Sequence, residues 1–247
     1  MIRSVLLAIV IIIFFIVVIP FELIGYVIGL FSMKARNSYM KVVMMVVLST
    51  LGFLSGAKVT FIGMEKIPKD RAVLYVANHQ SYFDVILTIT KLPGPLCFVA
   101  KNSFKRIPIF AQGLALYNTL FIDRDNVKNA LGTILEAIER VRSGMSVFIF
   151  PEGRRTRDGK MDEFKEGSMK IATKSGCPII PVAITNTSEL FENHMPWVHA
   201  APVVVEILDP VYPEDYDKTE MKHLGKLCKE RIEAARDANY EKYCKSL

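Results

Sequence analysis

The sequence predicts an α/β fold: a single domain with a mostly buried mixed sheet covered by helices, preceded by an N-terminal two-helix membrane anchor. Two observations carry this prediction. The chain of 247 residues is 51% hydrophobic, and the excess lies at its N-terminal end. From Lys58 onward, short β-rich runs alternate with helical patterns, which indicates a sheet buried on both faces. We therefore expect membrane-anchoring helices at residues 1–57 and an α/β domain at residues 58–247.

Two apolar runs predict the anchor. As a helix, residues 5–19 would be about 22 Å long, shorter than the roughly 30 Å hydrocarbon core, and Pro20 and Glu22 interrupt the run. The second run, residues 42–57, contains Ser and Gly. If both crossed the bilayer, the basic connector 32–41 would face outside, against the positive-inside rule. Two alternatives remain: one long tilted or kinked span, or a helical pair embedded in one leaflet.

The anchor is expected to stay on the protein. No small-residue cleavage site follows Pro20, which argues against a cleaved signal peptide. We place the protein in the inner (cytoplasmic) membrane with the α/β domain on the cytosolic face, and the four cysteines, which lack CxxC spacing, fit reduced core thiols there. The net charge of +6 suits phosphorylated ligands or anionic lipid. Nucleic acid is not expected, because the chain lacks the motifs that mark its binding.

The elements of the α/β domain follow in order. Strands are predicted at residues 58–62, 72–77, 96–100, 118–123, 146–150, 178–184 and 203–208. The clearest helix covers residues 126–143, with Asp125 capping its start and Gly144 its end. A second helix covers residues 219–243. Since ligands of such folds bind at strand ends and the loops that follow them, functional side chains are expected directly after the strands.

Four predicted strands are followed by polar or charged residues. The stretch NHQSYFD, after the second strand, carries His79 and Asp84. The other three strand ends bring the remaining candidates: Lys101, Lys105, Arg124, Glu152, Gly153, Arg154, Arg155 and Arg157. The cations match phosphate oxygens, although some could be an ordinary solvated surface. Glu152 could bind a substrate hydroxyl or hold an arginine in place.

His79 is either a base oriented by Asp84 or a turn residue beside an aspartate that only caps the next helix. Positions i and i+5 of one helix diverge by about 140°, so the pair can meet only if His79 lies in the loop and Asp84 in the first helical turn. Ser81 as N-cap and Asp84 at N3 predict such a start. The two interpretations are compatible, because the capping carboxylate could also hold the imidazole Nδ1–H and leave the other nitrogen as a base.

The reaction follows from what the sequence lacks as well as from what it has. There is no G-x-S-x-G nucleophile elbow, and His79 and Asp84 have no further residues at metal-ligand spacing, so no metal is expected. The remaining option is that the base deprotonates a hydroxyl of the substrate, which then attacks an acyl carbon. An acyl thioester suits this attack, because its thiolate leaves readily.

The motifs resemble those of the glycerolipid acyltransferases. NHQSYFD is similar to the H-x4-D motif of that family, FVAKNSFKRIP and LFIDR to its second motif, FPEGRRT to its third and IIPVAI to its fourth. The short chain and apolar N-terminus look most like the 1-acyl-glycerol-3-phosphate acyltransferases, which convert lysophosphatidate to phosphatidate. The chain departs from the pattern at Arg154, where a small Thr or Ser is usual, and at Asn118, where Gly is frequent.

The resemblance implies roles for individual residues. His79 would be the base and Asp84 its partner, Lys101 and Arg124 would contact the phosphate, and Glu152, Gly153 and Arg155 would form the substrate-binding turn. Lys105 and Arg154 are added as substrate-binding candidates from their charge and position. No cofactor is implied; acyl-CoA or acyl carrier protein would be the co-substrate.

Three alternatives stay open at this stage. The first is a hydrolase acting on lipid phosphates or acyl esters, the second another lysophospholipid acyltransferase, and the third a non-catalytic module that docks on anionic lipid. The choice between acyl-CoA and acyl carrier protein is also open, because both present a thioester on the same phosphopantetheine arm.

Overall fold

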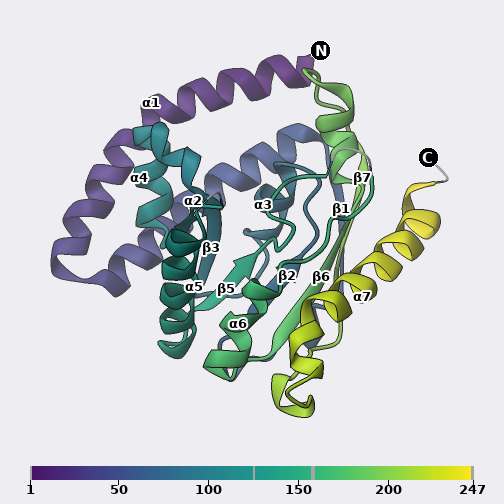
Figure 1. The fold of residues 1–247 in the computed structure, drawn as a ribbon. Helices are drawn as coiled ribbons and strands as arrows, with labels where there is room; N and C mark the ends of the chain where they lie inside the picture. Colours follow the sequence, from purple (N-terminus) through teal and green to yellow (C-terminus); the bar gives the residue numbers. More distant parts are fainter. Residues whose placement is uncertain (1, 125, 157–158, 246–247) are drawn as a thin grey trace.

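A seven-stranded mixed sheet forms the centre of the described part of the chain. The computed structural model describes residues 2–124, 126–156 and 159–245. Its strands are β1 (Lys58–Ile62), β2 (Leu74–Ala77), β3 (Leu96–Lys101), β4 (Leu120–Ile122), β5 (Ser146–Ile149), β6 (Ile179–Thr185) and β7 (Pro202–Ile207). Their order is β1-β7-β6-β2-β5-β3-β4; β6 and β7 are antiparallel, and all other neighbours are parallel. The predicted mixed sheet is therefore confirmed (Figure 1).

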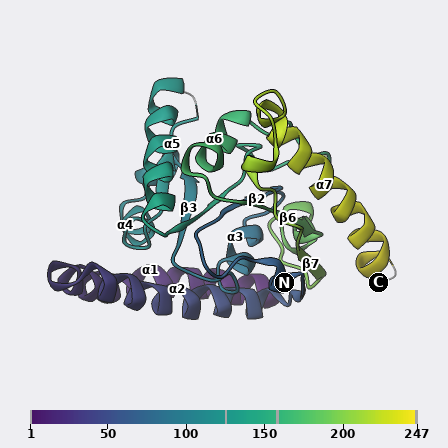
Figure 2. The same ribbon diagram turned by 90° about the horizontal axis from the view of Figure 1, so that it is seen from below.

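Helices cover both faces of the sheet. On one face lie α5 (Val127–Arg142), α6 (Glu166–Ser175) and α7 (Leu224–Asn239), and on the other lies α3 (Phe83–Thr88), with the two N-terminal helices beyond it (Figure 2). Each face has its own apolar cluster, because successive strand residues point to opposite sides. Tyr75 and Phe148 belong to the α3 side, and Leu74 and Val147 to the α5 side.

Two predicted helix boundaries shift. Asn126 caps α5, since its side chain accepts a hydrogen bond from the N–H of Asn129 at 3.2 Å; Asp125, the predicted cap, lies outside the described residues. Gly144 ends this helix with φ of 87°, as predicted. The predicted helix 219–243 is divided into a short 3₁₀ turn, α7 and a terminal π-helical turn.

The N-terminal region forms two long antiparallel helices, α1 (Ile2–Phe31) and α2 (Met33–Ser55). The basic connector 32–41 is almost entirely helical: only Ser32 separates the helices, and its hydroxyl caps α2 by accepting the N–H of Ala35 at 3.2 Å. The following Met, Lys, Ala and Arg are strong helix formers, so the helix begins early. Gly56, in the left-handed conformation with φ of 75°, ends α2.

The helix pair only partly fits the predicted two-helix anchor. Among the described residues, α2 is long and apolar enough to cross a membrane, whereas α1 contributes a shorter apolar segment, residues 19–31. Both helices also pack on the α/β domain: Leu7 of α1 and Met40 of α2 belong to the apolar cluster on the α3 side of the sheet. Figure 2 shows the pair lying side by side along this face.

Candidate active site

The candidate residues meet at the carboxyl edge of the parallel strands. His79 follows β2, Glu152 follows β5, Lys101 ends β3 and Arg124 follows β4. These strands are adjacent in the order β2-β5-β3-β4 and parallel, so their ends lie at one edge. The sequence-based expectation that four strand ends converge agrees with this topology.

His79 and Asp84 are in direct contact. Imidazole Nδ1 lies 2.7 Å from Asp84 Oδ2, in a site where the Asp84 side chain is fully buried and the His79 side chain is 15% exposed. The predicted geometry explains the contact: His79 is in the loop after β2, and Asp84 is in the first turn of α3. A face of the imidazole ring stacks on Phe150, with ring centroids 4.0 Å apart.

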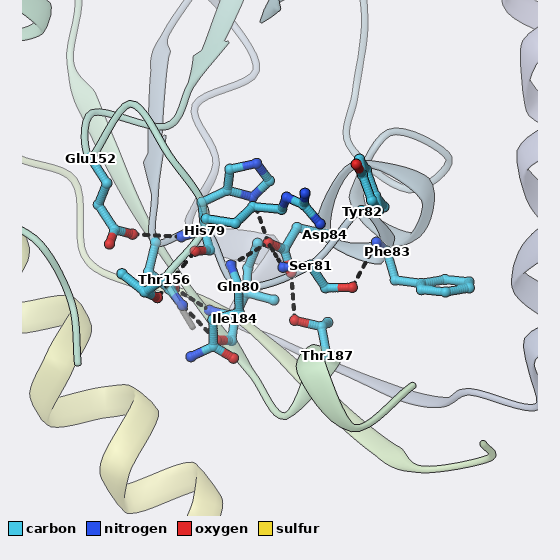
Figure 3. A network of polar contacts seen from close by, with 12 residues as sticks. His79, Gln80, Ser81, Tyr82, Phe83, Asp84, Glu152, Thr156, Ile184 and Thr187 are labelled. Carbon is cyan, nitrogen blue, oxygen red and sulfur yellow. Dashed lines mark hydrogen bonds and ion pairs between the residues drawn. The ribbon is translucent and has the colours of Figure 1, made fainter. Parts of the chain in front are cut away.

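Asp84 acts only as an acceptor in this network. Its carboxylate receives the N–H of Gln80 at 2.7 Å, the N–H of Ser81 at 2.9 Å and the hydroxyl of Thr187. Figure 3 shows Asp84 between the His79 ring and Thr187. An acceptor carboxylate requires a donor at Nδ1, which leaves the Nε2 lone pair of a neutral His79 available.

The cap and the His–Asp contact exist together. Ser81 Oγ accepts the N–H of Phe83 at 3.0 Å while the Asp84 carboxylate accepts the N–H of Ser81. This resembles the reciprocal arrangement of a capping box, except that Ser81 Oγ accepts the N–H two residues on rather than three; the helix proper begins at Phe83. The same carboxylate therefore closes the helix turn and orients the imidazole.

His79 opens into a largely apolar cavity of about 630 Å³. Its walls come from α2, α3, the end of β3 and the helix α4 (Pro108–Leu116). Apolar side chains such as Met44, Leu48, Val85 and Ile86 line it beside His79. A His–Asp pair at the end of an apolar cavity suits a substrate with a long hydrocarbon part.

Four of the predicted cations also line this cavity: Lys101, Arg124, Arg154 and Arg155. Lys105 does not line it; its ammonium lies 5.4 Å from the centroid of the Phe121 ring. The Arg154 side chain is 76% exposed, and its guanidinium forks onto the carboxylate of Asp162. Arg157 lies outside the described residues.

Arg155 is held in place by a stacked ring and an ion pair. Its guanidinium carbon lies 3.6 Å from the centroid of the Tyr82 ring, and Nη1 lies 2.7 Å from Glu192 Oε1. The same Glu192 oxygen accepts the N–H of Tyr82 at 3.0 Å. Stacking and pairing restrain the planar guanidinium to one orientation, so it is preorganised at the cavity that His79 also lines.

Glu152 supports the site from behind. Its two oxygens accept the N–H of His79 at 2.6 Å and the N–H of Asp162 at 2.9 Å, rather than lining the cavity wall. Figure 3 shows the carboxylate beside the His79 backbone. Gly153 has φ of 78°, and a Cβ there would lie 3.0 Å from Lys165 Nζ, so the tight turn requires glycine.

Burial raises the pKa of Glu152 from its ordinary 4.5 to about 7. Between these two pH values the unfolded chain is ionised at this position and the folded chain is protonated, so folding stability falls as pH rises. The shift corresponds to on the order of 3 kcal/mol. The free energy of unfolding is measured in detergent for wild type and Glu152→Gln across this pH range. As pH rises, that of the wild type should fall by this amount relative to that of the variant. If the difference in free energy of unfolding does not change with pH, the raised pKa of Glu152 is contradicted.

The sequence did not identify three residues of the site. Thr187 is fully buried and reaches Asp84, while Glu192 holds Arg155. Glu22 of α1 interrupts an apolar run in the sequence, but it is 6% exposed and lines the cavity. Gly113 of α4 makes room for it, because a Cβ there would lie 2.5 Å from Glu22 Oε1. An acidic residue within an apolar helix is unexpected, and this feature of the sequence could have identified Glu22 as a site residue.

The two departures from the family pattern are accommodated. Asn118 takes the left-handed conformation with φ of 62°, so the turn before β4 is retained without glycine. Its side-chain oxygen accepts a hydrogen bond from Arg36 of α2 at 3.2 Å, which ties the helix pair to the site. Arg154 pairs with Asp162, as described above. Among residues 2–124, 126–156 and 159–245, no three His, Cys, Asp or Glu side chains are grouped to hold a metal.

Comparison with known proteins agrees with the geometry. The acyltransferase family profile matches residues 58–185. The chain is 32% identical to a 1-acyl-sn-glycerol-3-phosphate acyltransferase of Borreliella burgdorferi, over 68% of this chain and 69% of that protein. It is 34% identical to the protein of the same name from Escherichia coli, over 65% of each chain, so the matched segment spans about two thirds of these relatives.

A solved structure extends the likeness to almost the whole chain. The crystal structure of the 1-acyl-sn-glycerophosphate (LPA) acyltransferase PlsC from Thermotoga maritima superposes with a TM-score of 0.79 at 28% identity, covering 96% of both chains. The N-terminal helix pair is therefore within the shared architecture. With its family motifs assembled around His79 and Asp84, the chain belongs to the acyltransferase family.

Proposed function

We propose that this protein transfers a fatty acyl group from an acyl thioester to the sn-2 hydroxyl of 1-acyl-glycerol-3-phosphate, giving phosphatidic acid. The observation that carries the proposal is the His79–Asp84 pair at a cavity that is apolar along its walls and cationic near Lys101, Arg124 and Arg155. The names of the related bacterial proteins support the same reaction.

The chemistry is a direct transfer. His79 Nε2 accepts the proton of the sn-2 hydroxyl while the hydroxyl oxygen attacks the thioester carbonyl carbon. The new C–O ester bond forms, the C–S bond breaks, and the departing thiolate takes up the proton from His79. Asp84 keeps Nδ1 protonated and stabilises the imidazolium that forms during attack. The balance needs neither a covalent enzyme intermediate nor a metal.

The acceptor is recognised by its two ends. Its phosphate suits the guanidinium forks of Arg124 and Arg155 and the ammonium of Lys101, since charge-assisted hydrogen bonds to phosphate are strong and directional. Apolar walls from α2 and α3 suit hydrocarbon chains. The donor thioester is acyl-CoA or acyl carrier protein, and no cofactor takes part.

The helix pair is proposed to hold the protein on the cytosolic face of the cytoplasmic membrane. Exposed apolar side chains run along α1, among them Ile9, Ile12 and Val17, and α2 adds Val42 and Val46. A face of this kind is stabilised by insertion into lipid. Substrate and product are lipids, so catalysis at the bilayer surface removes the need to extract them.

One assay separates this function from the alternatives. Labelled acyl thioester is incubated with the full chain in lipid, with and without lysophosphatidate. The proposal expects labelled phosphatidate only when the acceptor is present. Release of free fatty acid from water alone would favour a hydrolase, transfer to other lysophospholipids at equal rates would favour a broader acyltransferase, and no turnover would favour a lipid-docking module.

Arg124→Ala should weaken acceptor binding. Loss of a charge-assisted contact of about 1.5–3 kcal/mol corresponds to a roughly tenfold to hundredfold higher KM for lysophosphatidate, with kcat changed less. Lys105→Ala is the matched control, because Lys105 does not line the cavity, and its KM should stay near wild type. An unchanged KM in Arg124→Ala would exclude it as a phosphate ligand.

Thr187→Val should slow transfer although Thr187 is a positioning residue. Valine has the same shape but cannot donate to Asp84, which leaves a buried carboxylate oxygen with one partner fewer. We expect kcat to fall roughly tenfold with KM for lysophosphatidate little changed. Thr187→Ser keeps the donor and should recover most of the rate; failure of serine to do so would show that the hydrogen bond is not what matters.

A further inference from the structure

The loop between β6 and β7, residues 186–201, exposes two large apolar side chains. Met195 is 62% exposed and Trp197 is 40% exposed. The loop has its own internal contacts: His194 Nε2 lies 2.8 Å from Glu189 Oε2, and the rings of His194 and His199 stack with centroids 4.1 Å apart. Met195 and Trp197 thus lie exposed on a loop that its own side-chain contacts stabilise.

This loop contacts the start of α1 and the residue that follows α2, which lie at the same end of the helix pair. The N–H of Val198 donates to Ser4 Oγ in the first turn of α1 at 2.7 Å. Ala200 packs on Gly56, directly after α2, so closely that a Cβ at Gly56 would lie 2.9 Å from the Cβ of Ala200. Figures 1 and 2 both show the start of α1 beside the loop. Loop and helices therefore belong to one face of the molecule.

The apolar surface continues from the loop onto the helices. Ile2 is 79% exposed and Val5 52% exposed at the start of α1, and Phe53 is 84% exposed near the end of α2. Arg3 lies at the same junction, with its guanidinium carbon 3.0 Å from the Cβ position of Gly56. Exposed apolar patches of this kind mark interaction surfaces.

We propose that Met195 and Trp197 form a lipid contact of the α/β domain itself, inserting at the headgroup level of the bilayer on which α1 and α2 lie. The inference rests on the membrane association proposed above and adds a contact point to it. Tryptophan prefers the membrane–water interface, where its ring is apolar and its N–H finds a polar partner. Arg3 matches anionic headgroups, and exposed apolar side chains recur along the whole of α1, from Ile2 to Phe31.

The contact has a consequence for the site. Glu192, which holds Arg155 and the N–H of Tyr82, lies in the 3₁₀ turn Glu192–His194 directly before Met195. Lipid docking of Met195 and Trp197 therefore holds Arg155, at the wall of the cavity, close to the bilayer surface. A lysophospholipid phosphate lies at that level, so the acceptor can enter without leaving the membrane.

Trp197 is the only tryptophan of the chain, so its fluorescence reports on this loop alone. The full chain is added to vesicles of phosphatidylglycerol and phosphatidylcholine, in which part of the lipid carries bromine on the acyl chain. Flotation of the vesicles measures binding independently. We expect the protein to float, its emission to shift to shorter wavelength, and quenching to be strongest with bromine near the headgroup.

Each outcome decides the inference. Protein that floats while its emission maximum does not shift and brominated lipid does not quench it would overturn the loop contact and leave the proposed membrane association intact. Protein that does not float would overturn both.

A variant pair links the contact to catalysis. Met195→Lys should partition into vesicles about tenfold more weakly and turn over vesicle-borne lysophosphatidate correspondingly less, while activity on a monomeric short-chain lysophosphatidate stays unchanged. Leu135→Lys is the matched control, because Leu135 is 55% exposed on α5, on the opposite face of the sheet. Equal vesicle partitioning of the two variants would contradict the proposal.

Discussion

Replacing His79 with alanine is expected to lower kcat for acyl transfer by about a thousandfold or more. The attacking hydroxyl is a poor nucleophile until its proton is removed. Because Asp84 engages Nδ1 of His79, the lone pair on Nε2 is available at the cavity to accept that proton. The measurement is steady-state transfer from a labelled acyl thioester to lysophosphatidate.

Two controls separate lost chemistry from lost structure. Flotation with vesicles and thermal melting should remain near wild type in His79→Ala, because the imidazole contributes one stacking contact, with Phe150, and one side-chain hydrogen bond. His223→Ala removes a histidine from an exposed turn outside the cavity and should be fully active. Substantial residual transfer in His79→Ala would contradict the assignment of His79 as the general base.

Asp84→Asn is expected to cost between about 10²-fold and 10⁴-fold in kcat. Asparagine can turn its carbonyl oxygen to the three N–H donors and its amide to the Thr187 hydroxyl, so the helix turn can persist. The variant loses the negative charge that stabilises the imidazolium while His79 holds the proton. Transfer rates and circular dichroism of the same preparation test both halves of this expectation.

The double variant tests whether the two residues act as one unit. If Asp84 works through His79, adding Asp84→Asn to His79→Ala should slow transfer little beyond His79→Ala alone, because the effects of coupled catalytic residues are not additive. A full multiplicative loss would show that Asp84 contributes by another route, such as holding the Gln80–Ser81 turn.

Most of the α/β domain could be predicted from local pattern. The run KVTFI coincides with β1, and the other strands lie within a few residues of their predicted positions. These runs are apolar and β-branched, and burial on both faces makes such patterns plain in one dimension. The convergence of His79, Lys101, Arg124 and Glu152 followed from parallel topology alone.

The N-terminal region was harder to predict. Pro20 and Glu22 were interpreted as an interruption, because proline removes a helical hydrogen bond and a charge opposes burial in lipid. In the structure α1 continues through Pro20, and Glu22 faces the cavity beside Gly113. Packing against α2 and α4 decides this outcome, and no local pattern encodes a contact between segments so far apart.

The sequence by itself determined the strands, the convergence of their charged ends and the His79–Asp84 contact, because a capping box is a local interaction within a few residues. Only the tertiary structure decided which partners complete the site. Thr187 reaches Asp84 from 103 positions away, and Glu192 holds Arg155 from 37 positions away. Such pairings depend on how the β6–β7 loop returns to β2, and that return is fixed by packing of the whole sheet rather than by the pattern of any one segment.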